Sequence, residues 1–237
     1  REETVYALPD CVSLESFSPR AVDAEILAHS RAALHLPDNR PVVAYLGLLA
    51  DYQGTPHLLR AASHLMTWET PFHLLMMGFP SVERYRGMAR EPGIEEHVTF
   101  TGKVPYEDAP SHLALGDIAV APKLSTTEGA GKILNYMAME LPTVAFDTPV
   151  SREYLGSLGA YASPVGDARA LARAIQELLK LPQPERQALG QRLRARASEH
   201  FSWERSGRRL LEIYRSLLGE TEAPRRSTRT GEMQRDT

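Results

Sequence analysis

Five short apolar runs, rich in valine and leucine, recur along the first two-thirds of the chain. They read PVVAYLG (41–47), FHLLMMG (72–78), HVTFTG (97–102), DIAVAP (117–122) and PTVAFD (142–147). Such runs are too continuous for strands with one exposed face and too short for helices, so they predict strands that are buried on both faces. The fold must therefore cover both faces of a sheet.

The segments between these runs have helical patterns. They span roughly 54–66, 81–90, 106–115 and 131–140. Strands that alternate with helices at this spacing are typical of βαβ units, whose right-handed crossovers produce a parallel sheet with helices on both faces. We predict a doubly wound, Rossmann-like α/β fold.

After about residue 165 the chain has only helical patterns, at roughly 167–180, 184–200 and 203–218. In the last of these, one face carries large apolar residues at helical spacing, as a docking helix requires, and Ser202 is a good N-cap. The polar residues 219–237 lack periodicity and are predicted to be a disordered tail. We therefore divide the chain into a linker and first helix (1–40), a Rossmann-like domain (41–218) and this tail.

Composition excludes several classes of function. The formal net charge of −3 gives no global field that would attract nucleic acid. The single cysteine, Cys11, cannot form an internal disulfide, and the sequence has no spaced Cys/His set typical of a metal site. With no apolar run of the ~18 residues that span a bilayer and no signal peptide, we predict a cytoplasmic protein without a metal or cofactor.

Two further features of the sequence stay open. The C-terminal helices are rich in arginine, which indicates either a solvated face or attraction to the inner face of a membrane that carries a lipid acceptor. The chain begins without methionine, and its first residues resemble the middle of a protein. We expect a fragment or an excised domain.

The loops after the predicted strands are the first candidates for a ligand site, because open parallel sheets bind ligands beyond the carboxyl ends of their strands. Lys103, Lys123 and Lys132 all fall in these loops, and the chain has only one other lysine. Their positions either indicate a pocket for an anionic group or arise by chance from so few lysines.

The sequence EGAGK at 128–132 is the strongest local signal. Gly129 and Gly131 let backbone amides approach a ligand, and the helix that begins near Lys132 and Ile133 is expected to present unpaired N–H groups to a phosphate. Glu128 would repel phosphate but could accept hydrogen bonds from hydroxyls. A ligand with both groups is a nucleotide sugar. The alternative is a tight turn with an acidic residue in front of a helix.

The segment EGAGKILNYMAMELPTVAFDTPVSREYL resembles the donor site of the GT-B glycosyltransferases of family 4. Four further segments are similar to this family in the same order: LPDCVSLESFSP, VVAYLGLLADYQGTPHLLRA, VTFTGKVPYEDAPSHLALGDIAVAPKLS and FSWERSGRRLLEIYRSLL. The resemblance covers about 8–218. It implies a C-terminal, donor-binding, Rossmann-like domain, with the N-terminal acceptor-binding domain absent from this chain.

The resemblance also assigns roles to individual residues. Glu128 matches the glutamate that contacts the donor sugar, and we take Glu128 and Lys132 as the catalytic candidates. The other predicted donor-binding residues lie at the end of the first strand, in the loop that borders the nucleobase in this family, and in the loop and helix start after the fourth strand. They are Gly47, Lys103, Val104, Lys123, Gly129, Ala130, Gly131, Ile133, Leu134 and Asn135.

Three positions depart from the family pattern. Asn135 stands where a second glutamate usually holds the ribose, and its amide can still donate and accept hydrogen bonds. Leu48 and Gln53 stand where the family commonly has an arginine and a lysine that hold the diphosphate. Either Lys123 or Lys132 replaces these cations, or the donor is bound without catalysis.

The resemblance implies a glycosyltransferase of the hexosyltransferase class that works with retention and without a metal. Its acceptor would be lipid-linked or a saccharide, and this chain alone should bind the donor with little or no turnover. Two alternatives remain: a non-catalytic module that binds nucleotide sugars or docks a partner, and, less favoured, a nucleotide-sugar epimerase.

Overall fold

A computed structural model of the chain describes residue 6 and residues 8–219. In this part of the chain, six parallel strands form one sheet in the order β3-β2-β1-β4-β5-β6. The strands are β1 (Val42–Leu46), β2 (His73–Met77), β3 (Val98–Gly102), β4 (Ile118–Ala121), β5 (Thr143–Phe146) and β6 (Ala160–Ala162). Each of the five predicted runs contains one of the first five strands, so these predictions are confirmed.

The sequence did not predict β6, the edge strand that pairs with β5 from Val144↔Ala160 to Phe146↔Ala162. This strand has only three residues, two of them partly exposed, so it has no continuous apolar run. Its pairing depends on β5 rather than on its own sequence.

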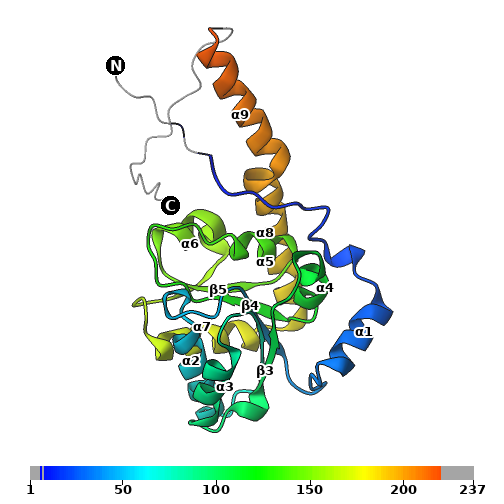
Figure 1. The fold of residues 1–237 in the computed structure, drawn as a ribbon, viewed down its shortest axis with the longest axis vertical. Helices are drawn as coiled ribbons and strands as arrows, with labels where there is room; N and C mark the ends of the chain where they lie inside the picture. The colour runs from blue at the N-terminus through cyan, green and yellow to red at the C-terminus, as the bar shows by residue number, and fades with distance from the viewer. Residues whose placement is uncertain (1–5, 7, 220–237) are drawn as a thin grey trace.

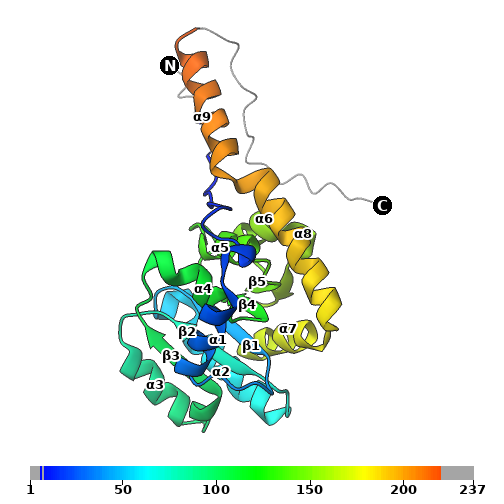
Figure 2. The same cartoon turned by 90° about the vertical axis from the view of Figure 1, so that its right-hand side faces the viewer.

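Helices cover both faces of the sheet, as predicted for a doubly wound fold (Figures 1 and 2). The main helices are α1 (Ala24–Ala33), α2 (Thr55–Thr67), α3 (Val82–Arg90), α4 (Ala109–Leu113), α5 (Lys132–Ala138), α6 (Pro149–Leu155), α7 (Ala168–Lys180), α8 (Gln183–Phe201) and α9 (Trp203–Leu217). One hydrophobic cluster joins the sheet to α2, α3 and α7. The other joins it to α4, α5, α6 and α8.

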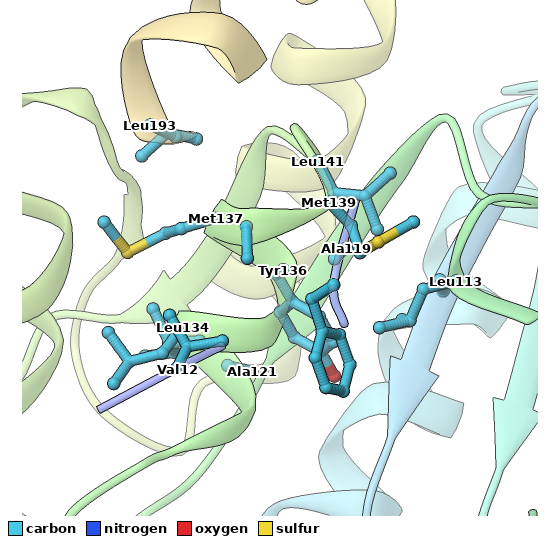
Figure 3. Packing of buried hydrophobic residues seen from close by; sticks show 14 of the residues in the cluster. Val12, Leu113, Ala119, Ala121, Leu134, Tyr136, Met137, Met139, Leu141 and Leu193 are labelled. Carbon is cyan, nitrogen blue, oxygen red and sulfur yellow. The ribbon is translucent and has the colours of Figure 1, made fainter. Parts of the chain in front are cut away.

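Tyr136 of α5 is fully buried and anchors this short helix to the end of β1. Its hydroxyl accepts a hydrogen bond from the Leu46 N–H at 2.8 Å. Figure 3 shows Leu134, Tyr136 and Met137 of α5 in a cluster with Val12 and with Leu193 of α8. Because α5 is packed so closely, the loop in front of it has a fixed end.

The segment around Val12 and Phe17 packs against the core next to α8. Val12 donates to the Phe201 carbonyl at 2.9 Å, and the Phe17 side chain is fully buried. Arg194 of α8 donates to the carbonyls of Leu14 and Ala138. Arg194 therefore connects three backbone segments by hydrogen bonds. It does not belong to a solvated face of the arginine-rich C-terminal helices, which was one interpretation of the sequence.

Helix α9 begins after Ser202, whose hydroxyl accepts from the Arg205 N–H at 3.4 Å, so the predicted N-cap is confirmed. The helix projects away from the sheet (Figures 1 and 2). Its predicted apolar face is exposed, with Trp203 62% and Leu217 66% accessible. Apart from Gly219, the tail predicted over 219–237 lies outside the described residues, and the division of the chain into domains stays a prediction. None of the described helices combines the length and the apolar character needed to cross a membrane.

Candidate functional site

The strand order places the ligand crevice between β1 and β4. These strands are neighbours in the middle of the sheet, but the chain continues from β1 to β2 on one side and from β4 to β5 on the other. The loops that leave their carboxyl ends therefore diverge, and ligands bind at such a switch point in open α/β sheets. Residues 47–54 and 122–131 form these two loops.

Two glycines in the loop after β1 allow other groups to approach its backbone closely. Gly54 has a positive φ of 78°, and a Cβ atom on it would lie 1.8 Å from the Pro122 carbonyl oxygen. Only glycine allows this contact between the loop after β1 and the loop after β4. A Cβ on Gly47 would lie 2.7 Å from the Lys132 ammonium, so the missing side chain of Gly47 leaves space for that group.

The Lys132 ammonium lies at the end of β1, in a group that we name the Lys132 cluster: Tyr45, Gly47, Gln53 and Lys132. Its Nζ donates to Gln53 Oε1 at 2.9 Å and to the Tyr45 hydroxyl at 3.3 Å. It also lies 4.4 Å from the centroid of the Tyr45 ring. Among residues 8–219, no carboxylate forms an ion pair with Lys132.

This environment disfavours the charged form of Lys132. Burial, together with the positive charge of Lys123, lowers the pKa of Lys132 to about 7. Tyr45 gives no compensating negative charge, because burial raises the pKa of its hydroxyl, which donates to the Leu48 carbonyl at 2.6 Å. The cluster therefore has a cation that lacks a counter-ion, and an anionic ligand would supply one.

Lys123 has a different set of partners. Its ammonium pairs with Glu128 Oε2 at 2.9 Å and donates to the Gly129 carbonyl at 2.8 Å. The Lys123 side chain is 9% exposed and that of Glu128 is 63% exposed. The Ser125 hydroxyl accepts from the Glu128 N–H at 3.2 Å. We name residues 125–131 the donor loop. Its acidic residue is thus held by both its backbone and its side chain.

The glycines of the donor loop have different surroundings. A Cβ on Gly129 would lie 2.5 Å from Asp10 Oδ2, which accepts a 2.8 Å hydrogen bond from the Tyr154 hydroxyl. A Cβ on Gly131 would meet no atom within 4 Å among the residues described. A side chain at residue 129 would therefore have to displace the Asp10 carboxylate, whereas the open space beside Gly131 is available to a ligand.

The start of α5 differs from the sequence-based expectation. The side chains of Ile133 and Leu134 are buried. Their N–H groups donate to the carbonyls of Ala130 and Gly131 at 2.8 and 3.0 Å. The prediction that Ile133 presents an unpaired N–H group is wrong, because a tight turn at the helix start already uses it.

The remaining predicted residues, Asn135, Lys103 and Val104, belong neither to the Lys132 cluster nor to the donor loop. Asn135 is partly buried on α5, three residues after Lys132. Lys103 is exposed beyond β3, with its ammonium 5.4 Å from the centroid of the Phe79 ring, and Val104 packs against the core. In the sheet, β3 is separated from β1 by two strand spacings. Lys103 and Val104 therefore follow a strand that lies about 10 Å from β1.

Sequence reasoning missed three residues that shape the site. Tyr45 resembles any core residue of a buried strand, and no local pattern distinguishes it. Asp10 and Tyr154 meet only in the folded chain, on the inner side of Gly129. Within the described residues, no group of three or more His, Cys, Asp or Glu side chains could hold a metal ion.

The parallel sheet and its strand order define a Rossmann-like domain, whose switch point lies between β1 and β4. The family model of "Glycosyl transferases group 1" matches residues 28–196. The chain belongs to this family, and it is the C-terminal domain of a GT-B glycosyltransferase of family 4. The sequence-based resemblance is confirmed.

Among curated proteins, the chain is similar to the GDP-mannose-dependent alpha-(1-6)-phosphatidylinositol monomannoside mannosyltransferase of Mycolicibacterium smegmatis. The two are 31% identical over 227 residues, which cover 91% of this chain and 56% of that protein. The chain spans about half the length of the curated relatives it matches.

Solved structures show the same fold. A glycosyltransferase from Rickettsia africae aligns with a TM-score of 0.80 and 20% identity, covering 90% of this chain and 57% of that one. The C-terminal domain of a glycosyl transferase group 1 family protein (LpcC) from Francisella tularensis aligns with a TM-score of 0.66 and 17% identity. In that case the alignment covers 81% of this chain and 99% of the other.

Proposed function

We propose that this chain is the donor-binding half of a retaining glycosyltransferase of the hexosyltransferase class, which transfers a sugar from a nucleotide-diphosphate sugar. The observation that carries the proposal is the Lys132 ammonium, which lies beside Gly47 at the switch point and has no carboxylate partner among the residues that the structure describes. The relative from Mycolicibacterium smegmatis is GDP-mannose-dependent, which supports the same class of donor.

Lys132 holds the diphosphate in this proposal. A fixed positive charge stabilises the leaving diphosphate in the transition state, which can contribute several kcal/mol. Leu48 and Gln53 cannot supply this charge, but Lys132 Nζ lies 2.9 Å from Gln53 Oε1. The Lys132 ammonium therefore reaches the position where related enzymes would place a lysine at residue 53. This proximity favours replacement of the lost cation over loss of catalysis.

Glu128 contacts the donor sugar. Its carboxylate is largely exposed and can accept hydrogen bonds from sugar hydroxyls. The Asn135 amide forms hydrogen bonds with the ribose hydroxyls, and Lys103 and Val104 border the nucleobase. The N–H groups of Gly129 and Gly131 face the sugar and the phosphates, whereas that of Ala130 contacts the Tyr154 hydroxyl. The Lys132 ammonium, the loop amides and the dipole of α5 together stabilise the negative charge of the departing diphosphate without a metal.

Sugar transfer takes place in the cleft between this domain and an N-terminal half, so the chain alone binds the donor with little or no turnover. The acceptor is a lipid-linked compound or a saccharide, and the enzyme works in the cytoplasm or at the inner face of a membrane. The named acceptor of the mycobacterial relative, a phosphatidylinositol monomannoside, supports a lipid-linked acceptor.

Calorimetric titration of the 237-residue chain tests the donor assignment. The ligands are UDP, GDP, UDP-glucose and GDP-mannose. We expect one nucleotide and its sugar to bind, with Lys132→Met weakening both and Glu128→Gln weakening only the sugar nucleotide. The absence of any binding, or equal binding by both variants and the unmodified chain, would refute the proposal.

The missing charges at Leu48 and Gln53 favour one second candidate, a non-catalytic module that binds nucleotide sugars. Joining the chain to the N-terminal half of its own protein separates the two. Transfer or hydrolysis of the donor supports the enzyme, and binding without turnover supports the module. Release of an epimerised sugar nucleotide would instead indicate an epimerase.

A further inference from the structure

We propose that Lys123 is a positioning residue, which holds the Glu128 carboxylate and the Gly129 carbonyl in place for the donor sugar and does not itself contact the diphosphate. This inference rests on the proposed function, because it takes Glu128 as the group that meets the sugar. It gives Lys123 a role different from the direct donor contact that its place in a crevice loop suggests.

Within residues 8–219, both polar contacts of the Lys123 ammonium lie inside the donor loop. One contact is the ion pair with Glu128 Oε2 at 2.9 Å, and the other is the hydrogen bond to the Gly129 carbonyl at 2.8 Å. An ammonium has three N–H donors, so these two partners use most of its capacity. The two acceptors belong to consecutive residues, and one side chain thus fixes both the carboxylate and the backbone beside it.

Burial separates Lys123 from a ligand in the crevice. Only 9% of its side chain is exposed, whereas 63% of the Glu128 side chain is exposed. A ligand can therefore reach the carboxylate but has little access to the ammonium. Glu128 Oε2 is occupied by Lys123, and in the described part of the chain no other hydrogen bond or ion pair engages this carboxylate. Oε1 is then the oxygen that can accept from a sugar hydroxyl.

A fixed carboxylate matters because the donor loop has little else to hold it. The loop has two glycines, and Glu128 is exposed at its tip. The Ser125 hydroxyl restrains the Glu128 backbone but not its carboxylate. Immobilising a free glutamate side chain on binding lowers the affinity, whereas the ion pair with Lys123 restrains this carboxylate before the ligand arrives.

The test is a double-mutant cycle on the 237-residue chain, read by calorimetry with GDP and GDP-mannose and with UDP and UDP-glucose. The variants are Lys123→Met, Glu128→Gln and the two together. Lys123→Arg is the conservative variant, and circular dichroism confirms that each variant is folded. Lys123→Met keeps most of the unbranched side chain and removes the ammonium with its charge and donors.

We expect Lys123→Met and Glu128→Gln each to weaken the sugar nucleotide about 10-fold, and the double variant to weaken it by the same factor instead of 100-fold. The nucleotide without sugar should change less than about 3-fold in each variant. Lys123→Arg should retain most of the affinity, because a guanidinium can contact the same two acceptors.

Two results would overturn the role of Lys123. Equal losses for nucleotide and sugar nucleotide in Lys123→Met would place the ammonium on the diphosphate. Multiplying losses in the double variant would show that Lys123 and Glu128 act independently. If the unmodified chain binds none of the four ligands, the proposed function itself fails, and the role of Lys123 fails with it.

Discussion

Lys123 and Lys132 lie at the two ends of one short loop, but their surroundings are opposite. Lys123 pairs with Glu128 at 2.9 Å, and its charge is compensated inside the protein. In the described part of the chain, Lys132 donates only to the neutral oxygens of Gln53 and Tyr45, and burial lowers its pKa to about 7. A buried lysine that pairs with a carboxylate stabilises its own loop, whereas a partly buried lysine without a carboxylate partner is suited to bind an anion from outside. The sequence alone does not distinguish these two roles.

Removing the Lys132 ammonium should give the largest effect. We expect Lys132→Met to weaken the nucleotide by about 10- to 100-fold, because a hydrogen bond to a charged group contributes about 1.5–3 kcal/mol. Calorimetry with the nucleotide that the unmodified chain binds measures this loss. Lys180→Met is the matched control, since Lys180 is 59% exposed on α7 and pairs with Glu177. Equal losses in the two variants would contradict a specific role of Lys132 in binding the phosphates.

The pH dependence should be the next largest effect. Lys132 has a pKa of about 7 and must be protonated to hold a phosphate, so binding above this pH requires proton uptake. The protonated fraction falls from about three-quarters at pH 6.5 to about 3% at pH 8.5, and the affinity should fall by up to roughly 25-fold.

The sugar nucleotide is the suitable ligand for this titration, because its two phosphates do not change their charge in this range. Lys132→Arg should flatten the profile, since a guanidinium stays charged at every pH tested. Calorimetry in buffers of different ionisation enthalpy counts the protons. An affinity that is constant from pH 6.5 to pH 8.5 would show that Lys132 does not change its charge on binding.

The glycines of the donor loop should give a smaller effect. We expect Gly131→Ala to leave the melting temperature unchanged but to weaken the sugar nucleotide by about 5- to 10-fold, because its Cβ would enter open space beside the crevice. Gly129→Ala should lower the melting temperature instead, since its Cβ would lie 2.5 Å from Asp10 Oδ2.

Gly207→Ala is the control for this pair. A Cβ there also meets nothing within 4 Å in the described structure, but Gly207 lies on α9, away from the crevice. This variant should leave the affinity unchanged. If Gly131→Ala binds the sugar nucleotide as well as the Gly207 variant does, the ligand does not approach Gly131.

Much of the fold follows from the sequence, because continuous apolar runs and helical periodicity are local signals. They located β1 to β5 and the long helices α2, α7, α8 and α9. Strand β6 lacks such a signal because it has three residues and is defined by its pairing with β5. The doubly wound order then places the switch point between β1 and β4, and the ligand site expected there stays a prediction.

Side-chain pairings within the site could not be predicted in the same way. The hydrogen bond between Lys132 and Gln53 joins residues 79 positions apart in the sequence. The hydrogen bond between Tyr154 and Asp10 joins residues 144 positions apart. The sequence identified Lys132, Glu128 and Gln53 as unusual positions, but only the folded chain shows which of them meet. Lys123 and Glu128 are close enough in sequence to pair, yet the same spacing also allows both to face a ligand.

The central claim is that the Lys132 ammonium supplies the charge that residue 53 lacks. The most direct test moves this charge back, with Lys132→Gln alone and with Lys132→Gln combined with Gln53→Lys, each titrated with the nucleotide that the unmodified chain binds. Since Lys132 Nζ lies 2.9 Å from Gln53 Oε1, a lysine at residue 53 can place its ammonium near the same point. We expect the single variant to lose affinity about 10- to 100-fold and the double variant to recover to within about 5-fold of the unmodified chain. A double variant that binds as weakly as Lys132→Gln would contradict the account.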